Sequence, residues 1–78
     1  MPHIVIKTIS GKPKDRLQEA AENALSAVSK SLGKPEKYFS VAVEEYSLGE
    51  WEGVYNECIK DNTDVLIKPG YSNPVTFE

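Results

Sequence analysis

The order of three patterned segments constrains the fold of this chain most strongly. Residues 3–9 alternate and are rich in β-branched side chains, which predicts a strand with apolar residues on both faces. Residues 14–32 place their apolar side chains on one helical stripe: Leu17, Ala20, Ala21, Ala24, Leu25, Val28 and Leu32. Residues 38–46 alternate again and predict a second strand. Strand, helix and strand in this order form a β-α-β unit, whose two strands are parallel.

Glycine and proline mark both ends of the predicted helix. The run from Ser10 to Pro13 predicts a turn, with Pro13 in the first turn of the helix. Gly33 favours a left-handed C-cap, and Pro35 prevents the helix from resuming. We therefore expect one helix over residues 14–32.

The last third of the chain has weaker patterns. Residues 51–60 show helical spacing and predict a short helix despite Gly53. Residues 64–68 suggest one more short element, followed by a turn at Pro69-Gly70. No repeat, low-complexity tract or linker interrupts the chain, so residues 1–78 are expected to form a single domain.

A chain of 78 residues buries little surface when it folds alone. Two parallel strands by themselves leave unpaired edges and one large uncovered face. A second copy of the chain is the economical way to extend such a sheet. We therefore expect a homo-oligomer.

Composition disfavours several classes of partner and cofactor. The net charge is −3, with no basic cluster, so no nucleic-acid partner is expected. No apolar run approaches the length of a membrane span, so no membrane partner is expected. Cys58, the single cysteine, cannot form an intrachain disulfide, which fits a cytoplasmic protein. One cysteine and one histidine also make a zinc site built by this chain alone improbable.

Pro2 is the residue with the sharpest chemical potential. If Met1 is removed, Pro2 begins the chain with a free secondary amine at the start of a strand. An α-amino group has a pKa of about 7.7–8.0, and apolar surroundings lower it toward neutrality. A base that is neutral near pH 7 suits proton transfer between carbon and oxygen. On these residues alone, a proline that merely begins a strand is the competing interpretation.

Four segments together resemble the 4-oxalocrotonate tautomerase family. They are MPHIVIK, the helix, SVAV on the second strand, and Trp51 after LGE. The later WEGVYNECI and KPGYS are most similar to the bacterial PptA-like branch of that family, and the resemblance runs from Pro2 to about Ser72. It implies a β-α-β protomer that pairs into a four-stranded sheet in the dimer, with active sites near the subunit interface. The longer tail favours a homodimer over a hexamer.

The resemblance also implies roles for individual residues. Pro2 is the general base of a cofactor-free tautomerase acting on a 2-oxo acid. Lys12 stands where the family has its first arginine and would hold a substrate carboxylate. Ser40 stands where the family has its second arginine. This loss of a cation favours phenylpyruvate-like monoacids over dicarboxylates as substrates. Trp51 stands in place of a phenylalanine and would keep Pro2 dry, with its indole N–H as a further donor.

Two other interpretations remain open. Loss of both family arginines favours a non-catalytic dimeric module of the same fold. A related dehalogenase or decarboxylase would use the same proline, but the additional groups that activate water are not identifiable in this sequence.

His3 either tunes Pro2 or faces the sheet or interface, and Tyr71 either pins the tail onto a partner subunit or closes a turn.

Overall fold

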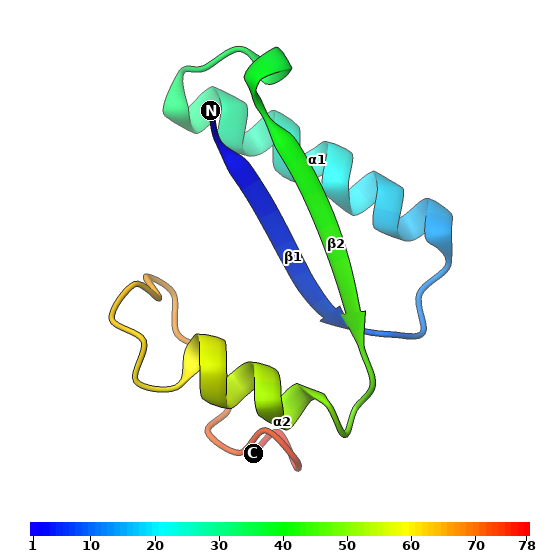
Figure 1. Cartoon of the computed structure of the whole chain (residues 1–78), viewed down its shortest axis with the longest axis vertical. Coiled ribbons are helices and arrows are strands. Elements are labelled where there is room, and N and C mark those ends of the chain that lie inside the picture. Colours follow the sequence, from blue (N-terminus) through cyan, green and yellow to red (C-terminus); the bar gives the residue numbers. More distant parts are fainter. The chain divides into compact units, whose positions relative to one another are not determined.

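The computed structural model describes all residues from 1 to 78, which divide into two compact units, Met1–Glu45 and Tyr46–Glu78. The first unit consists of β1 (His3–Ile9), α1 (Lys14–Leu32), a short 3₁₀ turn η1 (Glu36–Tyr38) and nearly all of β2 (Ser40–Tyr46). β1 and β2 run parallel as a two-stranded sheet, and α1 lies across one of its faces (Figure 1). The predicted β-α-β fold is confirmed, and the first strand and long helix have the predicted bounds.

The ends of α1 follow from its flanking residues. Pro13 is the N-cap, one residue outside the helix, and its carbonyl accepts hydrogen bonds from the backbone N–H groups of Arg16 and Leu17. Gly33 adopts the left-handed conformation expected of a C-cap, with φ of 65°. Most of the predicted apolar stripe is half-buried, but Ala20 and Leu32 are exposed.

The second strand begins at Ser40 rather than at Tyr38, so the predicted bound was wrong by two residues. The cause is Pro35, whose carbonyl accepts a hydrogen bond from the N–H of Tyr38 and begins the η1 turn. The carbonyl of Glu36 then accepts a hydrogen bond from the N–H of Phe39. These i to i+3 bonds hold the chain in a turn until it enters β2.

The sheet face opposite α1 has no covering element within the first unit (Figure 1). Its side chains come from alternate strand positions, including Val5, which is 43% exposed. On this face the Lys7 ammonium lies 2.8 Å from the Glu44 carboxylate, which joins the two strands. The face is therefore a mixture of apolar and charged side chains.

The second unit begins with a short helix and continues as irregular chain. α2 (Trp51–Val54) passes directly into a π-helical turn, η2 (Tyr55–Ile59), where the Lys60 N–H donates to the Tyr55 carbonyl over 2.8 Å. The predicted short helix is thus present, with a wider last turn. Val54 is 7% exposed and is the only buried side chain in the chain.

Residues 60–78 contain turns but no further helix or strand. The prediction of a short element at residues 64–68 is therefore wrong. Leu66 and Ile67 are 93% and 89% exposed. Asn62 accounts for the turn before this segment, because its side-chain oxygen accepts a hydrogen bond from the Asp64 N–H.

No helix of the structure is both long and apolar enough to cross a membrane. The single-domain interpretation stays a prediction.

Candidate functional site

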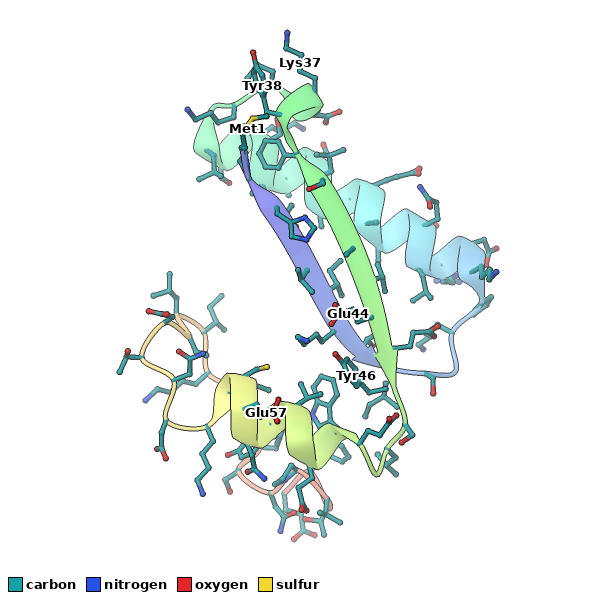
Figure 2. All side chains as sticks on the ribbon, viewed as in Figure 1. Met1, Lys37, Tyr38, Glu44, Tyr46 and Glu57 are labelled. Carbon is teal, nitrogen blue, oxygen red and sulfur yellow. The ribbon has the colours of Figure 1, made fainter.

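Pro2 lies immediately before β1 and is fixed by the start of β2. Its carbonyl accepts a hydrogen bond of 3.2 Å from the Ser40 N–H, and Pro2 is half-buried. Met1 precedes it and is 95% exposed. Figure 2 shows Met1 and Tyr38 at the end of the first unit where both strands begin. While Met1 is present the Pro2 nitrogen is an amide, and its removal would leave a secondary amine at this position.

Ser40 also joins the only histidine of the chain to this end of the sheet. The Ser40 hydroxyl and the His3 Nδ1 atom are 2.6 Å apart, on the sheet face opposite α1. Depending on the histidine tautomer, either group donates this hydrogen bond. The structure thus brings together Pro2 and Ser40, two of the four predicted site residues, and adds His3 to them. The parallel register supplies this contact, since positions 3 and 40 face each other across the strands.

Lys12 lies at the other end of β1, in a groove between α1 and the sheet. The groove has a volume of about 640 Å³. We call it the helix groove. It is lined by Ile6, Thr8, Gly11, Lys12, Pro13, Arg16, Leu17, Glu19, Ala20, Asn23 and Val43. Gly11 has φ of 127°, a conformation that favours glycine, and it turns the chain just before Lys12.

Arg16 is a second cation of the helix groove that the sequence interpretation missed. It follows Lys12 by four residues and lies in the first turn of α1. The groove therefore combines Lys12 and Arg16 with an apolar floor and one acid, Glu19. Such a lining fits an organic anion with an apolar body. The sequence does not give the conformation of the loop before α1. It therefore could not show that both cations line one groove.

Pro2 and Lys12 do not share a site within one copy of the chain. β1 has seven residues and separates them. At roughly 3.3 Å per residue, a strand of that length spans roughly 20 Å. The predicted base and the predicted carboxylate anchor consequently lie at opposite ends of the first unit.

Trp51 begins α2 and belongs to an aromatic cluster in the second unit. Its ring meets Tyr46 edge to face, with ring centroids 6.4 Å apart. Its indole N–H donates a hydrogen bond of 2.9 Å to the Tyr71 hydroxyl oxygen. The donor that we expected to be free for a substrate is therefore occupied. Tyr71 pins the tail onto Trp51 of its own chain.

A reciprocal pair of hydrogen bonds sets the position of Trp51 at the helix start. The Ser47 N–H donates to the Glu50 carboxylate over 2.7 Å, and the Glu50 N–H donates to the Ser47 hydroxyl over 3.1 Å. The hydrogen bond from the Ser47 backbone, and to a lesser extent interaction with the Ser47 side chain, lowers the pKa of the Glu50 carboxyl. This reciprocal pattern is that of a capping box, formed here on the turn of residues 47–50 just before α2, whose own N-cap is Glu50. The spacing of Ser47 and Glu50 was a readable signal for it, and the sequence interpretation did not use it.

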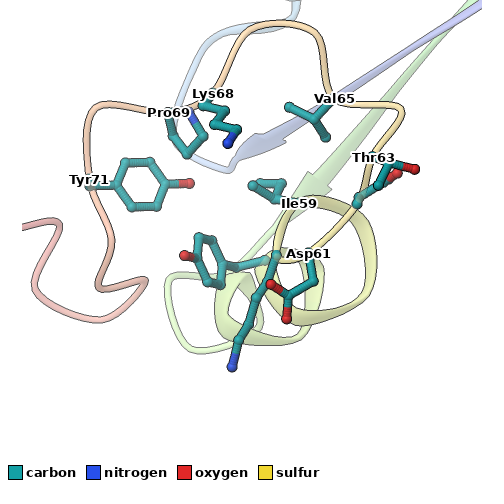
Figure 3. Close-up of a pocket in the computed structure, with 10 residues that line it drawn as sticks. Ile59, Asp61, Thr63, Val65, Lys68, Pro69 and Tyr71 are labelled. Carbon is teal, nitrogen blue, oxygen red and sulfur yellow. The ribbon is translucent and has the colours of Figure 1, made fainter.

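The tail encloses a second groove, of about 740 Å³, within the second unit. Figure 3 shows Lys68 and Tyr71 directed toward Ile59 in this groove, with Val65 and Pro69 beside them. The groove lies beside the Trp51 cluster because Tyr71 belongs to both. Tyr71 is thus the connection between the tail and the predicted site residue Trp51.

The fold and these positions can be set beside known proteins. No protein-family profile matches the chain. A probable tautomerase of Xylella fastidiosa (strain 9a5c) is 34% identical over 73 residues, which cover 91% of this chain and 89% of that protein. A probable tautomerase of Bacillus cereus is 34% identical over 47 residues, covering 60% of this chain and 77% of that protein.

Such identity over most of both chains, together with the β-α-β unit, defines an enzyme of the tautomerase class. The chain belongs to the tautomerase family. The prediction of a tautomerase is confirmed at this level. The roles of Pro2, Lys12, Ser40 and Trp51 stay predictions.

Proposed function

We propose that this chain is a cofactor-free tautomerase that interconverts the enol and keto forms of a phenylpyruvate-like 2-oxo acid, with Pro2 as general base after removal of Met1. The observation that carries the proposal is the position of Pro2 in a tautomerase-family chain. It directly precedes β1, it is half-buried, and Ser40 holds its carbonyl. The single cysteine favours a reducing, cytoplasmic location.

The reaction needs one group that both accepts and donates a proton. The Pro2 amine takes the proton from the enol oxygen, and the electrons of that O–H bond form the carbonyl. The carbon–carbon double bond then takes a proton at C3 from the protonated Pro2, which returns the amine to its neutral form. No atom is gained or lost, and no oxidant or metal enters the balance. A positioned general base of this kind contributes about 10²–10⁴-fold to a rate.

The other groups have supporting roles in this proposal. Lys12 and Arg16 of the helix groove attract the substrate carboxylate, and Arg16 compensates in part for a missing family arginine. Ser40 and His3, 2.6 Å apart beside Pro2, assist at the substrate oxygen as hydrogen-bond donors. Trp51 contributes an apolar wall, since its N–H is already bonded to Tyr71.

A complete site in this proposal needs two copies of the chain. Pro2 and Lys12 lie at opposite ends of β1, so Pro2 of one copy would act with the helix groove of another. The unpaired edges of β1 and β2 and the uncovered sheet face support a homodimer with a four-stranded sheet. We also propose membership of the PptA-like branch. In support, the alignment with the Xylella relative covers 91% of this chain and so extends into the tail.

The test is the conversion of phenylpyruvate enol to ketone, followed by ultraviolet absorbance, with protein whose intact mass shows that Met1 is absent. Pro2→Ala replaces the secondary amine by a primary one and should lower kcat/KM at least tenfold. Pro74→Ala, which changes a proline of the tail outside both grooves, should leave kcat/KM within about twofold. An unchanged rate in Pro2→Ala would refute the assignment. A wild-type chain without conversion would favour the non-catalytic module.

A further inference from the structure

We infer that Tyr71 is a positioning residue that fixes the Trp51 ring and so gives the site its selectivity for 2-oxo acids with an aromatic side chain. The inference rests on the proposed function, because Trp51 forms a wall of the substrate pocket only under that proposal. It assigns the C-terminal tail a role in the reaction.

The direction of the hydrogen bond between the two residues is fixed by their chemistry. An indole N–H can only donate, so the Tyr71 oxygen is the acceptor over the 2.9 Å that separates it from Nε1 of Trp51. The bond is partly buried and joins residues twenty positions apart. Partial exclusion of water makes such a bond harder to replace by solvent. The Tyr71 hydroxyl therefore determines where the indole edge lies.

A second contact holds the same ring from another side. Tyr46 meets Trp51 with an interplanar angle of 71°, the edge-to-face arrangement that aromatic pairs prefer. One contact fixes a point of the indole ring, and two contacts fix its plane. The ring is thus held between the end of β2 and the tail.

Tyr71 is itself held in place by two aromatic neighbours. Its ring centroid lies 5.8 Å from that of Tyr55 and 5.2 Å from that of Phe77. The Tyr55 hydroxyl also donates to the Ser72 carbonyl over 3.2 Å, next to Tyr71 in the chain. The tail is therefore anchored independently of Trp51 and can serve as the fixed side of the Trp51–Tyr71 bond.

A fixed indole plane favours flat substrates over flexible ones. An aromatic side chain can stack on a ring that is already oriented, so little rotamer freedom is lost when it binds. A branched aliphatic side chain gains less from the orientation, because its contacts do not depend on a ring plane.

Relatives that lack this tail should lack the Trp51–Tyr71 hydrogen bond and the selectivity that depends on it. The Bacillus cereus relative is shorter than this chain, since the same 47 residues make up 77% of it but 60% of this chain.

The experiment uses Tyr71→Phe, which removes the hydroxyl and keeps the ring. Trp51 is the only tryptophan, so the intrinsic fluorescence of the chain reports on it alone. Acrylamide quenching of Trp51 should increase about twofold. The KM for phenylpyruvate, measured by hydrogen–deuterium exchange at C3, should rise about three- to tenfold with kcat within about twofold. The KM for 4-methyl-2-oxopentanoate, which has an aliphatic side chain, should change less than about twofold.

Tyr55→Phe is the matched control, because it removes the bond to Ser72 in the same cluster without touching Trp51. It keeps the ring contacts of Tyr71 and its bond to Trp51, so quenching and both KM values should change much less than in Tyr71→Phe. Equal effects of Tyr55→Phe and Tyr71→Phe would overturn the inference, because the cause would then be tail docking in general. Increased quenching with an unchanged KM for phenylpyruvate would overturn it while leaving the proposed function intact. Failure of the proposed function would instead appear as an unchanged rate in Pro2→Ala.

Discussion

The two units of this chain distribute order and burial in opposite ways. The first unit contains β1, α1 and nearly all of β2, yet none of its side chains is fully buried. The second unit has one short helix and a long irregular tail, yet it contains Val54, the only buried side chain. Regular backbone hydrogen bonds thus do not require a packed core beside them. The first unit thus leaves a sheet face open, which the second copy in our proposal would cover.

The same contrast appears in the candidate site residues. Pro2, Ser40 and Lys12 are positioned by the backbone of the sheet and of the loop after it. Trp51 is positioned by side chains, through Tyr46 and Tyr71. Changes in the first unit should therefore affect activity more than the stability of the isolated chain. Changes in the second unit should affect both.

The largest expected effect on stability comes from Val54→Ala. Removing two methyl groups from the one buried side chain should lower the free energy of unfolding by about 2 kcal/mol. Val5→Ala is the control in the first unit, because Val5 is 43% exposed in one copy. Urea unfolding at low protein concentration measures both. A larger loss in Val5→Ala than in Val54→Ala would break the comparison and would indicate that a partner covers the sheet face.

A smaller effect, confined to substrate binding, is expected from the helix groove. Lys12→Met should raise the KM for phenylpyruvate about tenfold, and Arg16→Met about threefold, since each removes a cation that attracts the substrate carboxylate. Steady-state kinetics of both variants checks this. Lys30→Met, in the last turn of the same helix, is the control and should leave KM unchanged. Equal KM values in all three variants would exclude the helix groove from the site.

The smallest effect tests the capping box before α2. Ser47→Ala should lower the free energy of unfolding by about 1 kcal/mol at pH 7, a loss similar to that for capping serines, because the Glu50 N–H loses its acceptor. Thermal unfolding followed by circular dichroism measures it. A control is Ser72→Ala at the same pH, because that hydroxyl makes only a long hydrogen bond of 3.3 Å to the Glu78 carbonyl. A negligible loss in Ser47→Ala would show that the helix start does not depend on this cap.

The capping box also predicts a pH dependence. The pKa of the Glu50 carboxyl is lowered in the folded chain by its hydrogen bonds to Ser47. A carboxylate with a lowered pKa stabilises the fold fully above its ordinary value of 4.5 and loses that contribution as the pH falls through the folded value. The difference between wild type and Glu50→Gln, which removes the titrating carboxylate, should therefore shrink below pH 4.5. A difference that grows with acid would contradict the assignment.

Periodicity was sufficient for the elements whose burial follows a repeat. The stripe from Leu17 to Val28 and the alternation of residues 3–9 determine which faces are apolar, so α1 and β1 have the predicted bounds. Local hydrogen bonds were harder to predict. The η1 turn after Pro35 delays β2 by two residues, because a proline-initiated turn competes with the strand pattern. Residues 64–68 have apolar side chains but form only turns, because apolar composition without a repeat does not specify an element.

The candidate site divides along the same line. The resemblance of the sequence to a tautomerase was sufficient to predict Pro2 and Trp51 as site residues, because their positions in the sequence match the family motifs. The bonds of Ser40 to His3 and of Trp51 to Tyr71 join residues 37 and 20 positions apart. No local pattern encodes such distances. Only the strand register and the path of the tail reveal them.

The central claim is that the amine of Pro2 performs the proton transfer, and the most direct measurement compares one chain in two forms. Wild-type protein without Met1 and the same protein with Met1 retained are separated, verified by intact mass, and assayed for conversion of phenylpyruvate enol to ketone. The two forms differ by Met1, which turns the Pro2 nitrogen from an amine into an amide. The account predicts activity in the form without Met1 and at least a tenfold lower rate in the other. Equal rates in the two forms would contradict it.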